Sequence, residues 1–226
     1  MSSTPIKLVI FDLDGTLLDS VPDLAQAADE TVKALGYESV SVDKVRDYVG
    51  NGADILIGRC LSQSITVDSN LSSELLIKAR SLFDEFYEQT GHKASVLFPM
   101  VKETLSALHA QGIRLAIVTN KPSKFVPEIL RQHQIAEFFD DVLGGDAFET
   151  RKPDPIALNW LMEKYSLTPQ EVVMVGDSKN DILAAKNAQC CAFALTYGYN
   201  HGEPISDSNP DYVADQIDEL LKVVLN

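Results

Sequence analysis

Four short apolar segments, separated by stretches of helical periodicity, constrain the fold of this chain most strongly. They cover residues 6–11, 113–119, 171–175 and 191–196, and the first three are rich in β-branched residues. Short apolar runs of this kind are typical of strands buried on both faces, and strands that alternate with helices over short connections form a parallel sheet. We therefore predict an α/β fold with a Rossmann-like parallel-sheet core.

Residues 16–92 interrupt this alternation, because they show helical patterns and no convincing strand. The last of these patterns predicts a helix with Ser72 as its N-cap and Gly91 at its C-terminal end. An all-helical insertion directly after the first strand indicates a small cap domain over the carboxyl ends of the strands. We expect a core formed by residues 1–15 and 93–226 and a cap domain that specifies the substrate.

The acidic character of the chain restricts its partners. The formal net charge of the 226 residues is −14, which argues against nucleic acid and against an anionic membrane surface. An anionic substrate would need local positive charge or a metal ion to offset this global field. We expect no nucleic-acid and no membrane partner.

Cellular location is indicated by features of the termini and the cysteines. No stretch is long and apolar enough to span a bilayer, and the N-terminal residues lack the pattern of a signal peptide. The three cysteines, Cys60, Cys190 and Cys191, do not suggest a disulfide framework. We expect a cytoplasmic protein, either a monomer or a weak homodimer.

Polar residues with complementary chemistry follow the predicted strands or begin the helices after them. They are Asp12 and Asp14, Thr119 and Asn120, Lys152 before Pro153, and Asp177 and Asp181. The carboxyl ends of parallel strands lie at one edge of a sheet, so these residues are expected to converge there. Each feature alone also fits a helix cap, a turn or a solvated lysine. The functional interpretation depends on all of them occurring in one topology.

Their combined chemistry favours a phosphate ester and a metal. Carboxylates from two strand ends are typical ligands of Mg²⁺, which prefers oxygen donors. Lys152 offers a point charge for a phosphate, and Thr119 offers a hydroxyl. Asp181 stands four residues after Asp177, so a helix starting between them would place both on one side. There Asp181 would hold a metal-bound water or orient Lys152.

The sequence as a whole resembles a known superfamily. The stretch FDLDGTL, the strand-end Thr119, the Lys152-Pro153 pair and GDSKND are similar to the four motifs of the haloacid-dehalogenase-like superfamily. The resemblance covers the whole chain, including a helical cap after the first motif. A narrower resemblance, to the bacterial members that hydrolyse 2-phosphoglycolate, rests on four longer stretches: VGNGADIL, IVTNKPSKFV, VGDSKNDILAAKNA and LTYGYNHGEPI.

This resemblance implies a role for each motif residue. Asp12 resembles the nucleophile that forms an aspartyl-phosphate, and Asp14 the acid that protonates the leaving group and then activates water. Mg²⁺ would be bound by the Asp12 carboxylate, the Asp14 backbone carbonyl and Asp177, with Asp181 close to it. The substrate would be a small phosphorylated organic acid whose phosphoryl oxygens are held by Thr119 and Lys152, with Asn120 beside them.

A glycine-rich turn in the expected cap, Gly50-Asn51-Gly52, has two interpretations. In the structural one, Gly50 ends one helix and Asn51 caps the next. In the functional one, backbone amides at the start of the second helix bind the carboxylate of the substrate. The two interpretations are compatible.

Alternative functions remain at this stage. A sugar-phosphate phosphatase or a phosphosugar mutase of the same fold would use the same motifs. A hydrolytic dehalogenase is disfavoured, since Asp14 would have no task in it. A signalling receiver also holds an aspartyl-phosphate with acids, magnesium, a threonine and a lysine. However, the chain is too long for one receiver domain, and the helical insertion has no place in one.

Overall fold

A six-stranded parallel sheet forms the centre of the protein. The computed structural model describes residues 4–225, and in this part the strand order is β5-β4-β1-β6-β7-β8, with each neighbouring pair parallel. The strands are β1 (Leu8–Phe11), β4 (Arg114–Val118), β5 (Asp141–Leu143), β6 (Val172–Gly176), β7 (Cys191–Leu195) and β8 (Tyr212–Ala214). The predicted parallel-sheet core is confirmed, and the edge strands β5 and β8 are additions to it.

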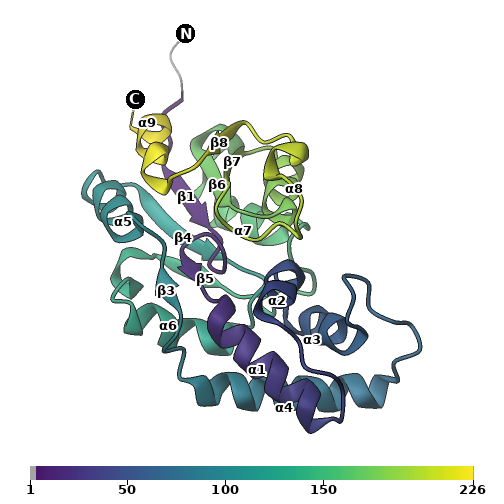
Figure 1. Ribbon diagram of the computed structural model, residues 1–226. Coiled ribbons are helices and arrows are strands. Elements are labelled where there is room, and N and C mark those ends of the chain that lie inside the picture. The colour runs from purple at the N-terminus through teal and green to yellow at the C-terminus, as the bar shows by residue number, and fades with distance from the viewer. Residues whose placement is uncertain (1–3, 226) are drawn as a thin grey trace.

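Helices cover both faces of this sheet (Figure 1). They are α5 (Val101–Ala110), α6 (Val126–Gln132), α7 (Ile156–Tyr165), α8 (Lys179–Asn187) and α9 (Leu220–Val224). Because side chains alternate along a strand, Val9 and Phe11 of β1 pack into the core that includes α5, α6 and α9. Leu8 and Ile10 pack into the second core, with α7 and α8. The central strand is thus buried on both sides, as its uninterrupted apolar sequence requires.

Successive strands of the sheet are added first on one side of β1 and then on the other. Strands β4 and β5 lie on one side of β1, whereas β6, β7 and β8 lie on the other. In register, Leu8 lies between Arg114 of β4 and Val172 of β6. A reversal of strand order opens a crevice at the carboxyl ends of the strands, which is where open α/β sheets bind ligands. The residues after β1, β4 and β6 therefore surround the expected site.

Four further helices follow β1 and form a layer beyond the carboxyl ends of the strands, in the lower part of Figure 1. They are α1 (Val21–Ala34), α2 (Val42–Tyr48), α3 (Ala53–Ser62) and α4 (Ser73–Thr90). The Ser72 hydroxyl caps α4 by accepting a hydrogen bond from the Leu75 amide at 3.2 Å, and Gly91 ends it in the left-handed conformation. Both predicted boundaries of this helix are confirmed. No helix within residues 4–225 is long and apolar enough to cross a membrane.

Two short strands mark the passages between the sheet layer and the inserted helices. Strand β2 (Leu18–Asp19) pairs antiparallel with β3 (Val96–Leu97). The helical insertion expected over residues 16–92 therefore begins with a two-residue strand, too short to leave a pattern in the sequence. Single 3-10 turns complete the structure at Ser123–Phe125, Ala136–Phe138, Pro169–Glu171, Ile205–Ser208 and Ile217–Glu219.

A buried carboxylate joins the two passages. Asp23, in the first turn of α1, is 1% exposed. Its side chain accepts hydrogen bonds from the Ser95 amide at 2.6 Å, the Ser95 hydroxyl at 2.5 Å and the Ala94 amide at 3.3 Å. The outgoing and returning chains are thereby held together through three donors that are largely shielded from water.

Replacing Asp23 by alanine is expected to destabilise the protein by about 2–4 kcal/mol, because buried donors lose their acceptor. Urea unfolding followed by circular dichroism measures this change. Gln26→Ala, at an exposed position of the same helix, is the control and is expected to change the stability by no more than about 0.5 kcal/mol. Equal stabilities of the two variants would contradict the role of Asp23.

Candidate active site at the carboxyl ends of the strands

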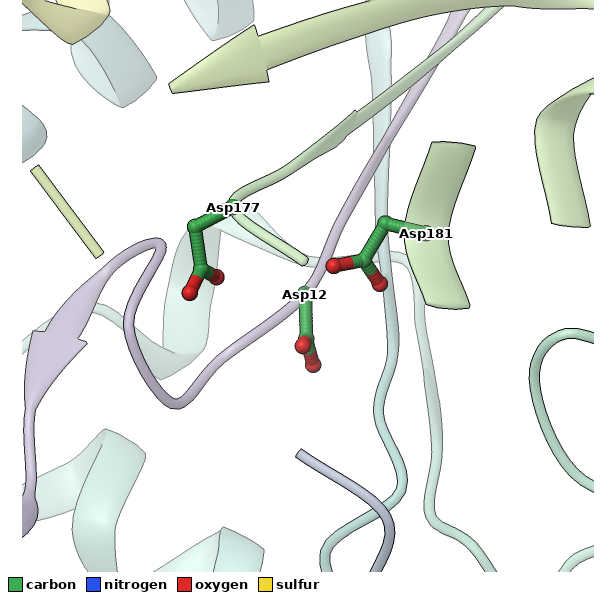
Figure 2. A group of neighbouring side chains, drawn as sticks. All are labelled: Asp12, Asp177 and Asp181. Carbon is green, nitrogen blue, oxygen red and sulfur yellow. The ribbon is translucent and has the colours of Figure 1, made fainter. Parts of the chain in front are cut away.

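Three carboxylates converge at the crevice beside β1 (Figure 2). Asp12 follows β1, Asp177 follows β6, and Asp181 lies in the first turn of α8. Each offers a carboxylate oxygen, and these oxygens lie within 4.8 Å of one another. All three residues are buried. The topology thus brings together the acids that the sequence analysis placed at two strand ends, with α8 beginning between Asp177 and Asp181 as expected.

Lys152 lies between two of these acids. Its Nζ is 2.6 Å from Asp181 Oδ1 and 3.1 Å from Asp12 Oδ1. The other oxygen of Asp181 accepts hydrogen bonds from the Ser178 amide at 3.0 Å and the Ser178 hydroxyl at 2.7 Å. Both oxygens of Asp181 thus have partners, and one of them contacts the same ammonium as Asp12. This geometry is compatible with the expected role of orienting Lys152.

Asp177 is fixed by contacts that the sequence analysis did not identify. Its Oδ1 accepts a hydrogen bond from the Thr16 hydroxyl at 2.6 Å, and its Oδ2 accepts one from the Tyr199 amide at 2.6 Å. Gly15 and Gly198 pack so closely that a Cβ on either would lie 2.2–2.3 Å from an atom of this side chain. Asp177 can therefore occupy this position only because the two residues that pack against it, Gly15 and Gly198, are glycines.

The cluster carries an excess of buried negative charge. Burial raises the pKa of Asp12 to about 6, in part offset by Lys152. Burial, followed by the charges of Asp181 and Asp12, also raises the pKa of Asp177 well above its usual range. Lys152 pairs with Asp12 and Asp181 and not with Asp177, so a further cation would favour the ionised form of all three carboxylates. An all-oxygen donor set of this kind fits Mg²⁺.

The residues after β4 connect the acids to the inserted helices. The Thr119 hydroxyl accepts a hydrogen bond from the Lys121 amide at 3.3 Å, and its side chain lies close enough to Asp12 to lower the pKa of that carboxyl. The Asn120 side-chain amide donates to the Lys152 carbonyl at 3.0 Å and to the Gly50 carbonyl, in the inserted layer, at 2.9 Å. Thr119 therefore lies at the reacting end of the crevice, while Asn120 holds the insertion against it.

The turn between α2 and α3 faces the sheet layer. The Gly50 carbonyl accepts a second hydrogen bond, from the Asn180 side chain at 3.1 Å. Gly52, with a φ of +86°, is the residue that precedes α3 as its cap. The expectation that Asn51 caps this helix is wrong, because only glycine adopts this conformation readily and the helix starts one residue later.

Asp14 has a partner that the sequence analysis missed. Lys121 Nζ lies 3.0 and 3.1 Å from the two Asp14 oxygens and donates to the Tyr87 hydroxyl at 2.7 Å. Tyr87 belongs to α4 in the insertion. The one available signal was the position of Lys121, two residues after the strand-end Thr119. No pattern in the sequence predicts its contact with Tyr87.

A cavity lies between the sheet layer and the insertion, beside Asp12 and Asp14. Its lining combines these acids, Thr119, Asn120 and Lys121 with the two glycines Gly50 and Gly52 and with apolar side chains. The apolar residues that line the cavity include Leu24, Val49, Ala53, Leu56, Phe83 and Phe125. Of the predicted site residues, the structure places Asp12, Asp14, Thr119, Asn120, Gly50 and Gly52 around this space, whereas Asn51, Lys152, Asp177 and Asp181 are not part of the lining.

Gly15→Ala is expected to weaken Mg²⁺ binding about 10- to 100-fold, because its Cβ would lie 2.2 Å from Asp177 Oδ2 and displace that carboxylate. Titration calorimetry with MgCl₂ measures the affinity. Gly36→Ala is a matched control, since Gly36 has a similar φ of +81° but no atom within 4 Å of the new Cβ. Unchanged Mg²⁺ affinity in Gly15→Ala would contradict the assignment of Asp177 as a ligand.

Comparisons with known proteins agree with this geometry. A family model for haloacid dehalogenase-like hydrolases matches residues 9–195. The chain is 68% identical over 224 residues to the phosphoglycolate phosphatase of Vibrio parahaemolyticus, covering 99% of this chain and 98% of that one. It is 67% identical over 220 residues to the phosphoglycolate phosphatase of Vibrio cholerae, covering 97% of each.

A solved structure shows the same architecture. The crystal structure of a predicted phosphoglycolate phosphatase from Haemophilus somnus superposes with a TM-score of 0.91 at 40% identity, covering 98% of this chain and 99% of that one. The match of the family model over most of the chain, together with relatives of nearly equal length, establishes the family. This chain belongs to the haloacid dehalogenase-like hydrolases.

Proposed function

We propose that this protein is a magnesium-dependent phosphomonoesterase that hydrolyses 2-phosphoglycolate to glycolate and phosphate through an aspartyl-phosphate. The observation that carries the chemistry is the buried contact of Lys152 with Asp12, beside a second acid, Asp14, in the same cavity. The choice of substrate is supported by relatives named phosphoglycolate phosphatase that match nearly the whole chain. Membership of a hydrolase family favours turnover over the signalling-receiver alternative.

The carboxylates of Asp12 and Asp177 and the backbone carbonyl of Asp14 would hold Mg²⁺, with Asp181 acting through Lys152. When bound, the ion supplies positive charge to the carboxylates and to the phosphoryl oxygens. The Thr16 hydroxyl and the Tyr199 amide keep Asp177 turned toward the cluster. This arrangement explains why three acids are buried together with one lysine.

Asp12 is the nucleophile in this proposal. One of its oxygens forms a bond to phosphorus while the bond to the ester oxygen breaks. An attacking carboxylate and a phosphate oxygen repel each other by roughly 4 kcal/mol at ~4 Å and an effective dielectric of about 20. Lys152, held 3.1 Å from Asp12, opposes this repulsion and stabilises charge on the phosphoryl oxygens. Thr119 exchanges its contact with Asp12 for a phosphoryl oxygen.

Asp14 is the proton carrier. It donates its proton to the departing oxygen, so that glycolate leaves as an alcohol. It then accepts a proton from the water that attacks the phosphorus of the aspartyl-phosphate, which restores Asp12 and releases phosphate. Splitting the displacement into two steps lowers the barrier of each. Proton transfer of this kind typically contributes ~10²–10⁴-fold to the rate.

The inserted helices supply specificity in this proposal. We assign residues 16–92 to a cap domain and residues 1–15 and 93–226 to the catalytic core. The start of α3 and the Gly50–Gly52 turn line the cavity, which supports a contact between their backbone amides and the carboxylate of the substrate. Asn120 and Asn180 hold the turn in place through the Gly50 carbonyl. Movement of the cap would admit substrate and then exclude water.

The substrate assignment predicts that kcat/KM with Mg²⁺ is highest for 2-phosphoglycolate in a panel with ethyl phosphate, p-nitrophenyl phosphate and glucose 6-phosphate. Steady-state phosphate release measures each value. A change in the Gly50-Asn51-Gly52 turn should raise KM for 2-phosphoglycolate more than KM for the aryl ester. A preference for the sugar phosphate would replace the substrate while leaving the phosphatase chemistry intact.

Asp14→Asn is expected to lower kcat by ~10²–10⁴-fold with 2-phosphoglycolate, whose alkoxide leaving group needs a proton. The loss should be much smaller with p-nitrophenyl phosphate, whose leaving group departs without one. Comparing kcat of the variant and the wild type on both esters separates the two cases. Near-normal rates of the variant on alkyl esters would remove Asp14 as the acid.

A further inference from the structure

Lys121 is a buried cation that the proposed reaction leaves without a task. Its side chain is 2% exposed, and its ammonium is enclosed by Asp14 of the core and Tyr87 of α4. The ammonium also lies 4.6 Å from the centre of the Tyr87 ring. A buried ion pair adds little net stability compared with well-packed apolar residues. The pair is therefore better explained by a ligand than by the stability of the fold.

The chemistry of the substrate places an anion near this lysine. Asp14 must lie within hydrogen-bonding distance of the ester oxygen to which it donates a proton. In 2-phosphoglycolate, the carboxylate carbon is two bonds from that oxygen. Lys121 Nζ is 3.0 Å from Asp14. Because Lys121 is hydrogen-bonded to Asp14, its ammonium is within reach of the substrate carboxylate, which lies two bonds from the leaving oxygen.

The lining of the cavity leaves Lys121 as the group with the required charge. Among the described residues that line it, Asp12 and Asp14 are anions and Lys121 is the cation. Lys152 is already held by Asp12 and Asp181. Without a cation, a substrate carboxylate at the backbone amides of the α3 start would still lie in the same small cavity as two acids, and no opposite charge would pair with it.

We propose that Lys121 is a specificity residue that binds the carboxylate of the substrate, with Tyr87 holding its ammonium from the cap side. This inference rests on the proposed function and deepens it. An ammonium has three N–H donors. In the structure they serve both oxygens of Asp14 and the Tyr87 hydroxyl, so reducing the Asp14 contact to one bond frees a donor for the substrate.

The contact with Tyr87 links substrate recognition to the inserted helices. Tyr87 is stacked on Phe83, with ring centres 5.7 Å apart, and packs edge-on against Phe125 at 5.0 Å. Its ring is thus fixed by apolar neighbours from both layers, and its hydroxyl points to Lys121. The carboxylate site is complete only when α4 lies against the core.

The test compares two esters that differ in one charge: 2-phosphoglycolate and its neutral amide, 2-amino-2-oxoethyl phosphate. For the wild type, kcat/KM should be higher with the acid. Lys121→Met should lower kcat/KM for the acid about 10²- to 10³-fold more than for the amide, with much of the difference in KM. Any general disturbance of Asp14 affects both esters and cancels in the ratio.

Two further variants complete the experiment. Tyr87→Phe keeps the ring packing and removes only the hydroxyl. The preference for the acid should fall by about 3- to 10-fold, the effect of one hydrogen bond of ordinary strength, because Tyr87 acts on the substrate through Lys121. Lys44→Met removes an exposed cation of the inserted helices that contacts the Gln63 side chain and does not line the cavity. Its effect should be the same on both esters.

Equal losses on both esters in Lys121→Met would overturn the inference and leave Lys121 as a positioning residue for Asp14. If Lys121→Met does not fold, an unchanged acid preference in Tyr87→Phe overturns it instead. A wild type that hydrolyses acid and amide equally well also overturns it, although the phosphatase activity stands. A wild type that hydrolyses neither ester but cleaves other phosphate esters contradicts the proposed substrate itself.

Discussion

The ion pair of Lys152 with Asp12 and Asp181 is the interaction on which the rest of the site depends. It lies at the carboxyl-end edge of the sheet, where two buried carboxylates contact one ammonium and a third, that of Asp177, lies beside them. Such an excess of negative charge is unfavourable in a protein interior unless a cation offsets it. The sheet, the glycines around Asp177 and the capping contacts of Asp181 all serve to hold these charges close together.

Much of this arrangement was predictable because it follows from local patterns and from parallel topology. Continuous apolar runs identified β1, β4, β6 and β7, and the shared edge of a parallel sheet then brought Asp12, Thr119, Asp177 and Asp181 together. The edge strands were missed for a physical reason. Each has three residues and is partly exposed, so neither shows the buried run that marks the central strands.

Contacts between distant segments could not be predicted from the sequence. Lys121 and Asp14 are 107 residues apart, and Thr16 and Asp177 are 161 apart, so no spacing pattern connects them. The cap of α3 was misplaced by one residue, at Asn51, because asparagine is a favoured capping residue and the left-handed φ of Gly52 is visible only in the structure. Function in this protein depends on both kinds of contact.

Some of the polar contacts between the inserted helices and the core lie around the cavity. The Gly50 carbonyl accepts hydrogen bonds from two asparagine side chains, and the Tyr87 hydroxyl accepts one from Lys121. These contacts are made by side chains that flank Asp12 and Asp14. In the proposed movement of the cap, closure and assembly of the reacting groups would be the same event.

The central claim is that Asp12, held by Lys152, attacks phosphorus. The most direct test is a single turnover of excess enzyme with 2-phosphoglycolate and Mg²⁺, quenched in acid and analysed by peptide mass spectrometry. The account predicts a phosphoryl group on Asp12 that appears before free phosphate and is absent from Asp12→Asn. Release of phosphate with no phosphorylated residue, or a phosphoryl group on another side chain, would contradict it.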